Sequence, residues 1–187
     1  SGSQDGSFNI GTGANNRDFT MVAQPDGKQV LGGLFTNYNG TAVNRVARIT
    51  RTGALDNTFS VGTGTNGAVT ASAVDASGRI LIGGGFSMYN GVQRARLARL
   101  NPNGTLDPSF DIGTGIGGGA VNTIAMQADG KILVAGAFSS FNGVAQNRLV
   151  RLNADGSRDA TFNIGTGFNG DVYSMAVDAD GKVVLGG

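Results

Sequence analysis

The chain of 187 residues contains no histidine, cysteine, tryptophan or glutamate, so all 13 of its acidic residues are aspartate. Histidine and cysteine supply most general bases, thiol nucleophiles and soft metal ligands in proteins. Lysine is also scarce, with Lys28, Lys131 and Lys182 its only members. The sequence therefore predicts a protein that is not an enzyme, uses no cofactor and has no metal site.

The net charge is +1, with neither a basic block nor an acidic tail. Nucleic acids bind through clustered lysine and arginine, so no nucleic-acid partner is expected. No apolar run approaches the roughly 18 residues of a membrane-spanning helix, so membrane insertion is not expected either. The absence of cysteine excludes disulfides, which suits the cytoplasm or the outside of a bacterium. We interpret residues 1–4, SGSQ, as the remnant of a purification tag.

Glycine is abundant, at 33 residues, and much of it follows a G-x-G-x-x-G pattern. The pattern occurs at Gly62, Gly64 and Gly67, at Gly113, Gly115 and Gly118, and at Gly165, Gly167 and Gly170. A dinucleotide-binding loop carries this spacing once, opens a helix and is followed about 20 residues later by a carboxylate. Here a strand-like segment follows Gly67, and Ser87 occupies the carboxylate position. We therefore interpret the glycines as sharp turns that need positive φ between structural units.

The dominant feature is an internal repeat. The spacings are 51, 51 and 52 residues between Phe8, Phe59, Phe110 and Phe162, and 51, 52 and 51 between Gly27, Gly78, Gly130 and Gly181. The extra residue lies in the segment GIGGGA, because the spacing is constant elsewhere. The predicted units are residues 17–67, 68–119 and 120–170, a partial unit at 171–187, and a leading outer strand and loop at 5–16.

Each unit has the pattern of a four-stranded antiparallel meander. Asp-Gly and Asn-Gly pairs between apolar residues predict tight hairpins, and KILVAGAF is a continuous apolar run typical of a buried strand. In the third unit we expect strands at residues 121–128, 131–138, 147–153 and about 158–164. Such units are typical of propeller blades, so we predict an all-β fold, a β-propeller with about 3.7 repeats of ~51 residues in this chain.

Four motifs recur in order along the chain: an Asp-Gly-Lys turn, a Gly-Gly pair after the second strand, a Phe-Asn-Gly or Tyr-Asn-Gly loop, and an Arg-Leu-Asn strand. Over nearly all of residues 5–187 they resemble the bacterial delta-60 repeat, a β-propeller family of unknown function. Two units depart from the pattern, because Ser77 replaces the turn aspartate and ANNRDF replaces a glycine-rich entry. The resemblance implies a secreted or surface-attached bacterial protein, hence an extracellular location, and carries no catalytic residues.

Arginine and aspartate recur eight residues apart across the second hairpin of each unit, as Arg48 and Asp56, Arg99 and Asp107, and Arg151 and Asp159. The spacing predicts cross-strand ion pairs that fix the strand register, with a ligand-binding role as the alternative. The segment DADGK, residues 178–182, resembles the start of a calcium loop. Such a loop needs a later glutamate, which is absent, so we interpret DADGK as a hairpin turn.

A candidate binding surface is expected where the loop between the second and third strands lies beside the loop that joins successive blades. Its aromatic, amide and charged residues are Tyr38, Asn39, Arg45, Tyr89, Asn90, Arg94, Phe141, Asn142 and Arg148, alongside Asn66, Asn169 and Asp171. Such groups can stack on and hydrogen-bond sugars or peptides. A second interpretation stays open, in which Asn-Gly forms turns and the aromatic rings pack between blades.

We expect a non-catalytic scaffold or interaction module, with a lectin-like glycan-binding propeller as the alternative. An enzyme is a third hypothesis, for which Asp18, Asp111 and Asp171 are candidates, but they do not recur as a pair. The last unit would lack its third strand, and exposed strand edges invite pairing. The expected partners are a second copy that completes a larger ring, neighbouring repeats, or a protein or glycan.

Overall fold

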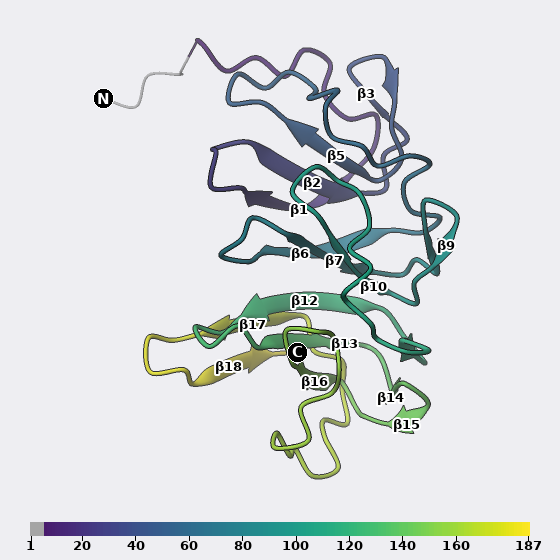
Figure 1. Ribbon diagram of the computed structural model, residues 1–187, viewed down its shortest axis with the longest axis vertical. Helices are drawn as coiled ribbons and strands as arrows, with labels where there is room; N and C mark the ends of the chain where they lie inside the picture. The colour runs from purple at the N-terminus through teal and green to yellow at the C-terminus, as the bar shows by residue number, and fades with distance from the viewer. Residues whose placement is uncertain (1–5) are drawn as a thin grey trace.

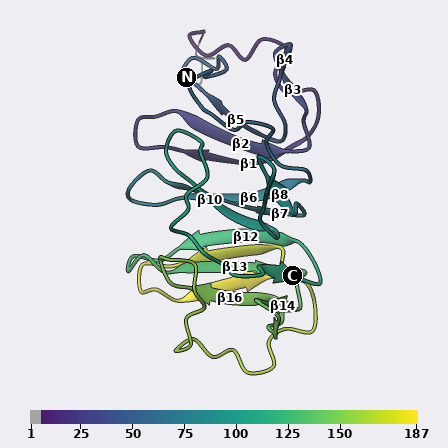
Figure 2. The same cartoon turned by 45° about the vertical axis from the view of Figure 1, so that its right-hand side comes forward.

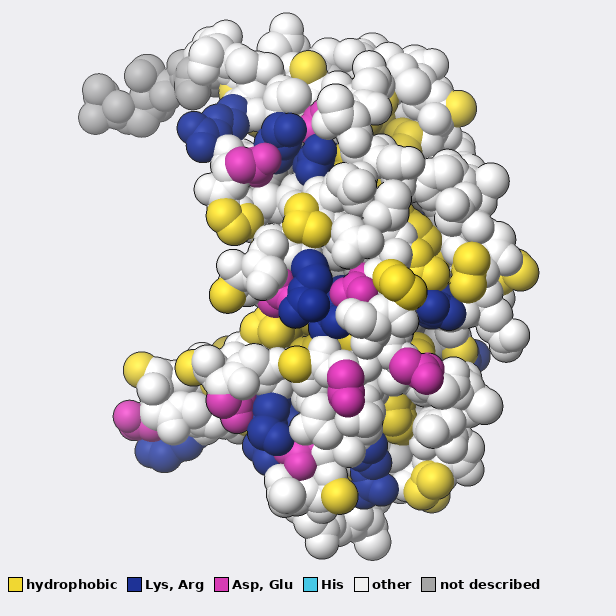
Figure 3. Space-filling model, in the orientation of Figure 1, with side chains coloured by type: hydrophobic (Ala, Val, Ile, Leu, Met, Phe, Trp, Pro, Cys, Tyr) yellow, Lys and Arg dark blue, Asp and Glu magenta, His cyan; other side chains and the backbone are white. Residues whose placement is uncertain are grey.

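The computed structural model describes residues 6–187, so the tag remnant expected at residues 1–4 lies outside the described residues. The described part contains 18 strands and no helix, and hence no helix that could cross a membrane. Figure 1 shows the strands gathered into small sheets that follow one another from the N-terminus to the C-terminus, and Figure 2 shows these sheets as stacked layers. The stack has a curved outline, hollowed on one side (Figure 3). The all-β prediction is confirmed.

Three sheets share one antiparallel order, in which the second strand in sequence lies in the middle. They contain β1 (Asp18–Ala23), β2 (Gln29–Gly33) and β5 (Val46–Ile49); β6 (Val69–Val74), β7 (Ile80–Gly84) and β10 (Leu97–Leu100); and β12 (Val121–Met126), β13 (Ile132–Gly136) and β16 (Leu149–Leu152). A fourth sheet contains β17 (Ser174–Val177) and β18 (Val183–Gly186). We call the units that carry these sheets the first to fourth repeats.

A short ribbon separates the second and third strands in each of the first three repeats. The ribbons are β3 (Asn37–Tyr38) with β4 (Thr41–Ala42), β8 (Met88–Tyr89) with β9 (Val92–Gln93), and β14 (Ser140–Phe141) with β15 (Val144–Ala145). Asn39 and Gly40 join β3 to β4 with φ of 49° and 84°, as a two-residue type I′ turn requires. The Asn-Gly turns are thus as predicted. Within the GIGGGA segment, β11 (Ile116–Gly117) adds a third strand beside β14.

The fourth strand of each of the first three repeats is much shorter than predicted. It makes one bridge per repeat, between Ile49 and Leu55, Leu100 and Leu106, or Leu152 and Arg158. The chain then turns, because Oδ1 of Asp159 accepts hydrogen bonds from the backbone N–H (3.0 Å) and hydroxyl (2.7 Å) of Thr161. A side chain that binds nearby backbone donors competes with strand pairing. We call residues 55–61, 106–112 and 158–164 the tails of the first three repeats.

The repeats pack face to face through the middle strands. Ile80 and Ile82 of β7 share a core cluster with Val30 of the first repeat, whereas Leu81 belongs to a cluster with Val134 of the third. All three side chains of β7 are 0% exposed. A strand that is buried on both faces explains the continuous apolar run in the sequence. The first strands β1, β6, β12 and β17 contact one another in succession.

The G-x-G pattern surrounds the asparagine of each type I′ turn. The N–H of Thr63 donates to Oδ1 of Asn90 (3.1 Å), and the N–H of Asn90 donates to the carbonyl of Gly64 (2.8 Å). A Cβ atom on Gly62 would overlap the side chain of Asn90, and Gly62 has φ of 56°. Strand β6 follows this loop instead of a helix. The glycines therefore have a structural role, as predicted. They allow the backbone a positive φ, and their lack of a side chain leaves room for the asparagine.

Two glycines separate the effect of close approach from that of backbone strain. Gly113 and Gly165 have φ of 59° and 62°, but a Cβ atom on Gly113 would meet Asn142, whereas one on Gly165 would meet nothing within 4 Å. We expect Gly165→Ala to lower the free energy of unfolding by about 1 kcal/mol, from backbone strain alone. Gly113→Ala should cost about 1 kcal/mol more, because Asn142 must move and lose its hydrogen bonds. Equal losses in urea denaturation would contradict this account.

Candidate functional site

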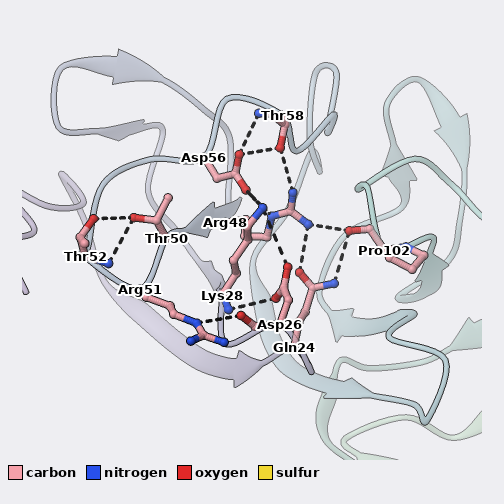
Figure 4. A network of polar contacts seen from close by, with 10 residues as sticks. All are labelled: Gln24, Asp26, Lys28, Arg48, Thr50, Arg51, Thr52, Asp56, Thr58 and Pro102. Carbon is pink, nitrogen blue, oxygen red and sulfur yellow. Dashed lines mark hydrogen bonds and ion pairs between the residues drawn. The ribbon is translucent and has the colours of Figure 1, made fainter.

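Arg48 of β5 is the centre of a polar network in the first repeat (Figure 4). Its Nε lies 2.9 Å from Oδ2 of Asp56, and its Nη2 donates to the hydroxyl of Thr58 (3.1 Å). Its guanidinium lies 4.6 Å from the ring centroid of Phe59. Nζ of Lys28 lies 2.9 Å from the same oxygen of Asp56. The side chains of Arg48 and Asp56 are only 7% and 6% exposed, so the ion pair is buried and depends on its hydrogen bonds.

The second and third repeats reproduce this network. Nε of Arg99 lies 2.7 Å from Oδ2 of Asp107, and Nε of Arg151 lies 2.8 Å from Oδ2 of Asp159. Each arginine also stacks on the phenylalanine of its own tail. All three predicted ion pairs are therefore present, and each joins a third strand to its tail.

Two of these arginines also bind the following repeat. Nη1 of Arg48 donates to the carbonyl of Pro102 (2.6 Å) in the turn after β10. Nη1 of Arg99 donates to the carbonyl of Ala154 in the turn after β16. Among residues 6–187, Arg151 meets no carbonyl of this kind. The arginine donors of the first two repeats are thus used within the fold, where they connect successive sheets.

The network also sets the ionisation of its aspartates. Burial by itself would raise the pKa of Asp56, but hydrogen bonds from Lys28 and Thr58 and the charge of Arg48 outweigh burial and hold the pKa well below its usual range. At Asp107, burial is likewise outweighed by its serine and arginine partners, so the pKa is lowered. All these carboxylates are therefore charged at neutral pH.

The predicted aromatic residues do not line an open surface. Tyr38, Tyr89 and Phe141 are 2%, 1% and 3% exposed. The hydroxyls of the two tyrosines donate to the carbonyls of Gly53 (2.8 Å) and Gly104 (2.5 Å), in the turn after the third strand. Burial raises the pKa of Tyr89. The prediction of an aromatic rim is wrong, because all three rings are buried. The alternative of packing between blades holds for Tyr89 and Phe141, whose core clusters span neighbouring repeats, whereas Tyr38 packs within its own repeat.

The asparagine side chains of the predicted surface also accept hydrogen bonds from the backbone. Asn39, Asn90 and Asn142 each accept a hydrogen bond from a threonine N–H in a glycine-rich loop. Oδ1 of Asn66 accepts from the N–H groups of two residues that begin the neighbouring ribbon. Asn169 is exposed and makes no hydrogen bond with the described residues. The amide oxygens of Asn39, Asn90 and Asn142 are thus used within the fold, while these three side chains stay exposed.

The prediction for Arg94 needs a correction, because the repeats align Arg45 and Arg148 with Arg96. These three arginines have φ of 62°, 66° and 67°, unusual values for a side chain of this size. Nη1 of Arg45 and of Arg96 donates to a carbonyl at the entry to the following repeat, at 2.7 Å and 2.6 Å. Nη1 of Arg148 turns back to its own repeat, and its Nε lies 3.2 Å from Oδ1 of Asp171. The 51-residue spacing from Arg45 could have identified Arg96.

A hollow of about 600 Å³ lies on the face of the first repeat that points away from the second. Its walls are mainly apolar and include Phe8, Ile10, Met21, Leu31 and Ile49, with Asp18 and Gln29 as polar members. The residues equivalent to Asp18 are valines exposed at 0%, 0% and 3%, namely Val69, Val121 and Val172. Burial raises the pKa of Asp18. This face is thus more polar than the matching buried faces of the later repeats.

The carboxylates considered for catalysis are distributed over different repeats. Asp18 begins β1, and Oδ1 of Asp111 accepts from the N–H of Gly113 (2.8 Å). Asp171 forms an ion pair with an arginine ahead of β17. In the DADGK turn, Oδ1 of Asp178 accepts from the N–H of Lys182 (2.8 Å). Within residues 6–187 no three acidic side chains lie close enough to hold a metal ion.

A family model described as "Domain of unknown function (DUF5122) beta-propeller" matches residues 24–59, 76–110 and 127–162, which make up more than half of the chain. Each match runs from the turn of the first hairpin to the phenylalanine of the tail. The chain belongs to this family. Its stacked sheets are therefore blades of a β-propeller. No curated protein matches the chain.

Among solved structures, the propeller is similar to a crystal structure of the extracellular domain of a protein described as a one component system, from B. thetaiotaomicron. The TM-score is 0.52 and the sequence identity 14%, over 94% of this chain and 21% of the other. At this identity the likeness shows the fold alone. The chain spans about a fifth of the length of that structure.

Arg99 and Arg151 allow a test of the link between blades. We expect Arg99→Ala to lower the free energy of unfolding by about 3 kcal/mol, because the buried Asp107 then keeps only Arg79, at 3.7 Å, as an ionic partner. Arg151→Ala is the control, since Arg151 has the same ion pair and ring contact but no carbonyl in a following blade, and Asp159 keeps Lys131 at 2.7 Å. Its loss should be smaller. Equal losses in urea denaturation would show that the bond to Ala154 contributes nothing.

Stability is expected to fall in acid because of the network aspartates. Their folded-state pKa values lie below the ordinary value of 3.8, so the unfolded chain takes up protons first. Their contribution is complete above that value and is lost as the pH falls through it towards the folded-state values. The urea concentration at which half of the protein is unfolded should therefore decrease once the pH is below about 4. Asp107→Asn should make this drop shallower, and an unchanged profile would contradict the assignment.

Proposed function

We propose that this propeller segment is a non-catalytic interaction module of a bacterial secreted or surface protein, of the delta-60 type. The observation that supports this proposal most directly is that the polar side chains repeated from blade to blade bind other parts of the fold. The charged side chains that recur in the first three blades, such as Arg99 and Asp107, bind one another, and Arg99 also binds the next blade. A framework built in this way holds surfaces in place and leaves few reactive groups free.

The proposed location rests on one further observation. The structure described above as an extracellular domain has a similar fold. The absence of cysteine is compatible with this location and with the cytoplasm alike. We propose other repeat-bearing segments as partners, including a second copy, because such segments match the apolar faces between blades.

The glycan-binding alternative receives less support. Rings that stack on sugars must be accessible, and the predicted ones, Tyr38, Tyr89 and Phe141, are buried. The surface charge does not favour a ligand of one sign either. On the face in Figure 3 the Lys and Arg side chains lie beside Asp side chains. A glycan array with the purified chain would test this alternative, and specific hits would revive it.

The absence of catalysis can be tested directly. We expect no turnover above the buffer rate when the purified chain is assayed with chromogenic glycosides, esters and phosphates and with acidic polysaccharides. The reason is that Asp111 and Asp171 lie in different parts of the fold and each is already bound. Turnover that copurifies with the chain and disappears in Asp111→Asn or Asp171→Asn would contradict the proposal. Asp26→Asn is the control for a carboxylate in an exposed turn.

A further inference from the structure

A glutamine side chain fills the space between the hairpin turns of the first and second blades. The Nε2 of Gln24 donates to the carbonyls of Gly78 (3.1 Å) and Pro102 (3.3 Å), both in the second blade. Its Oε1 accepts a hydrogen bond from Nη1 of Arg48 (3.1 Å), as Figure 4 shows. Gln24 is 6% exposed, so its carboxamide is a buried polar link between the two blades.

The same space between the second and third blades is a cavity of about 200 Å³. The repeat spacing of 51 or 52 residues makes Asp75 the equivalent of Gln24. The residues equivalent to the three partners of the glutamine are Arg99, Gly130 and Ala154. Asp75 and these three residues all line the cavity. The cavity therefore lies where a carboxamide is bound one blade earlier.

Asp75 does not replace the glutamine, because its carboxylate binds its own hairpin. Oδ1 accepts hydrogen bonds from the N–H groups of Ser77 and Arg79, both at 2.9 Å, and Oδ2 lies 2.6 Å from Nε of Arg79. In the first blade Asp26 caps the equivalent turn, and Ser77 stands at its position in the second. A carboxylate has no hydrogen to donate, and the carbonyl of Gly130 meets no donor within residues 6–187.

The charges around the cavity are already paired. Asp75 forms an ion pair with Arg79, and Nε of Arg99 lies 2.7 Å from Oδ2 of Asp107. The side chains of Asp75, Arg99 and Asp107 are 9%, 3% and 6% exposed. A charged ligand would lose its hydration without gaining an unpaired opposite charge. The site therefore favours a neutral polar group.

The cavity can be reached from solvent and has room for a small organic group. Ala76, Ser77 and Ala128 line it and are exposed. Its volume is several times the roughly 30 Å³ that one water occupies in the liquid. The remaining walls include the apolar side chains of Val74, Leu81, Met126 and Ile132.

We propose that this cavity is a binding site for a neutral primary carboxamide. The NH₂ group of the ligand donates to the carbonyls of Gly130 and Ala154, and its oxygen accepts from Arg99, as the side chain of Gln24 does one blade earlier. The amide belongs either to a free small molecule or to a glutamine side chain of another polypeptide. This inference goes beyond the interaction role proposed above and does not depend on it.

Propionamide is the probe for a titration followed by NMR of the ¹⁵N-labelled chain. We expect saturable shifts of the backbone amide signals of residues 75–79, 128–131 and 154. The dissociation constant should be in the millimolar range, because so small a ligand has few contacts. Propionate lacks the two donors and propylammonium lacks the acceptor, and both carry a charge. Each should bind at least about tenfold more weakly than propionamide.

Variants of the protein test the equivalence with the first blade. Asp75→Gln combined with Ser77→Asp gives the second blade the residues of the first, so the new glutamine should fill the cavity. This double variant should bind no propionamide and should resist urea better than the original chain. Asp26→Asn is the control, since Asp26 is exposed in the turn of the first blade and does not line the cavity. Its affinity for propionamide should be unchanged.

Gln24→Ala is the converse variant. It removes the carboxamide between the first and second blades, so propionamide should then bind at two sites per chain. The additional shifts should appear around Gly78 and Pro102, which meet the carboxamide in the original chain. A single site in this variant would contradict the assignment of this space to a carboxamide.

A peptide distinguishes the two sources of the amide. Tighter binding of acetylated, N-methylamidated Gly-Gln-Gly than of propionamide would indicate a glutamine side chain, and binding of propionamide alone would indicate a free small amide. Three results would overturn the inference. They are the absence of saturable shifts with either probe, which would leave water as the occupant, equal affinity for propionate, and undiminished binding to the double variant.

Discussion

The fold depends on a buried arginine whose guanidinium binds three different parts of the structure. Burying such a charge is costly unless it has an ionic partner and hydrogen-bond acceptors. Each of the three guanidinium nitrogens of Arg99 has an acceptor, namely Asp107, the hydroxyl of Ser109 or the carbonyl of Ala154, and the group also covers the ring of Phe110. The sequence of the tail follows from these contacts. An aspartate, a hydroxyl residue two positions later and a phenylalanine one further on must all stay where the arginine can reach them.

This constraint also explains why the blades form a stack in which each contacts mainly its neighbours. The network fixes a tail, and the tail forms one wall of the next blade, so cohesion passes from blade to blade as in other repeat proteins. The first blade has Asp18 and Gln29 at positions where the second and third blades bury valine and isoleucine, so its outer face is more polar than the faces between blades.

Much of the fold could be predicted from the sequence because repetition multiplies weak signals. One Asp-Gly turn is ambiguous, but several at a constant spacing define the blade, and the eight-residue spacing of Arg48 and Asp56 predicts their contact. The direction of Tyr38 could not be predicted, because a side chain beside a type I′ turn can face outward or towards the next hairpin. The alternation of apolar residues predicts a strand in the tail, whereas the hydrogen bond from Thr161 to Asp159 turns the chain there. Arg94 and Arg96 lie two residues apart, and only the 51-residue spacing from Arg45 distinguishes them.

Comparison of the repeats also shows a position in the first strand at which the residue type varies. The register of the first strand shifts at one residue in each of the first three blades, and the residue at this shift is Phe19, Thr70 or Asn122. Thr70 and Asn122 donate to carbonyls of the next blade, whereas Phe19 is 44% exposed. A residue at such a shift is outside the regular ladder, so its side chain can change without loss of strand pairing. In the network, by contrast, the arginine, the aspartate and the phenylalanine are the same in the first three blades, since each contacts the others.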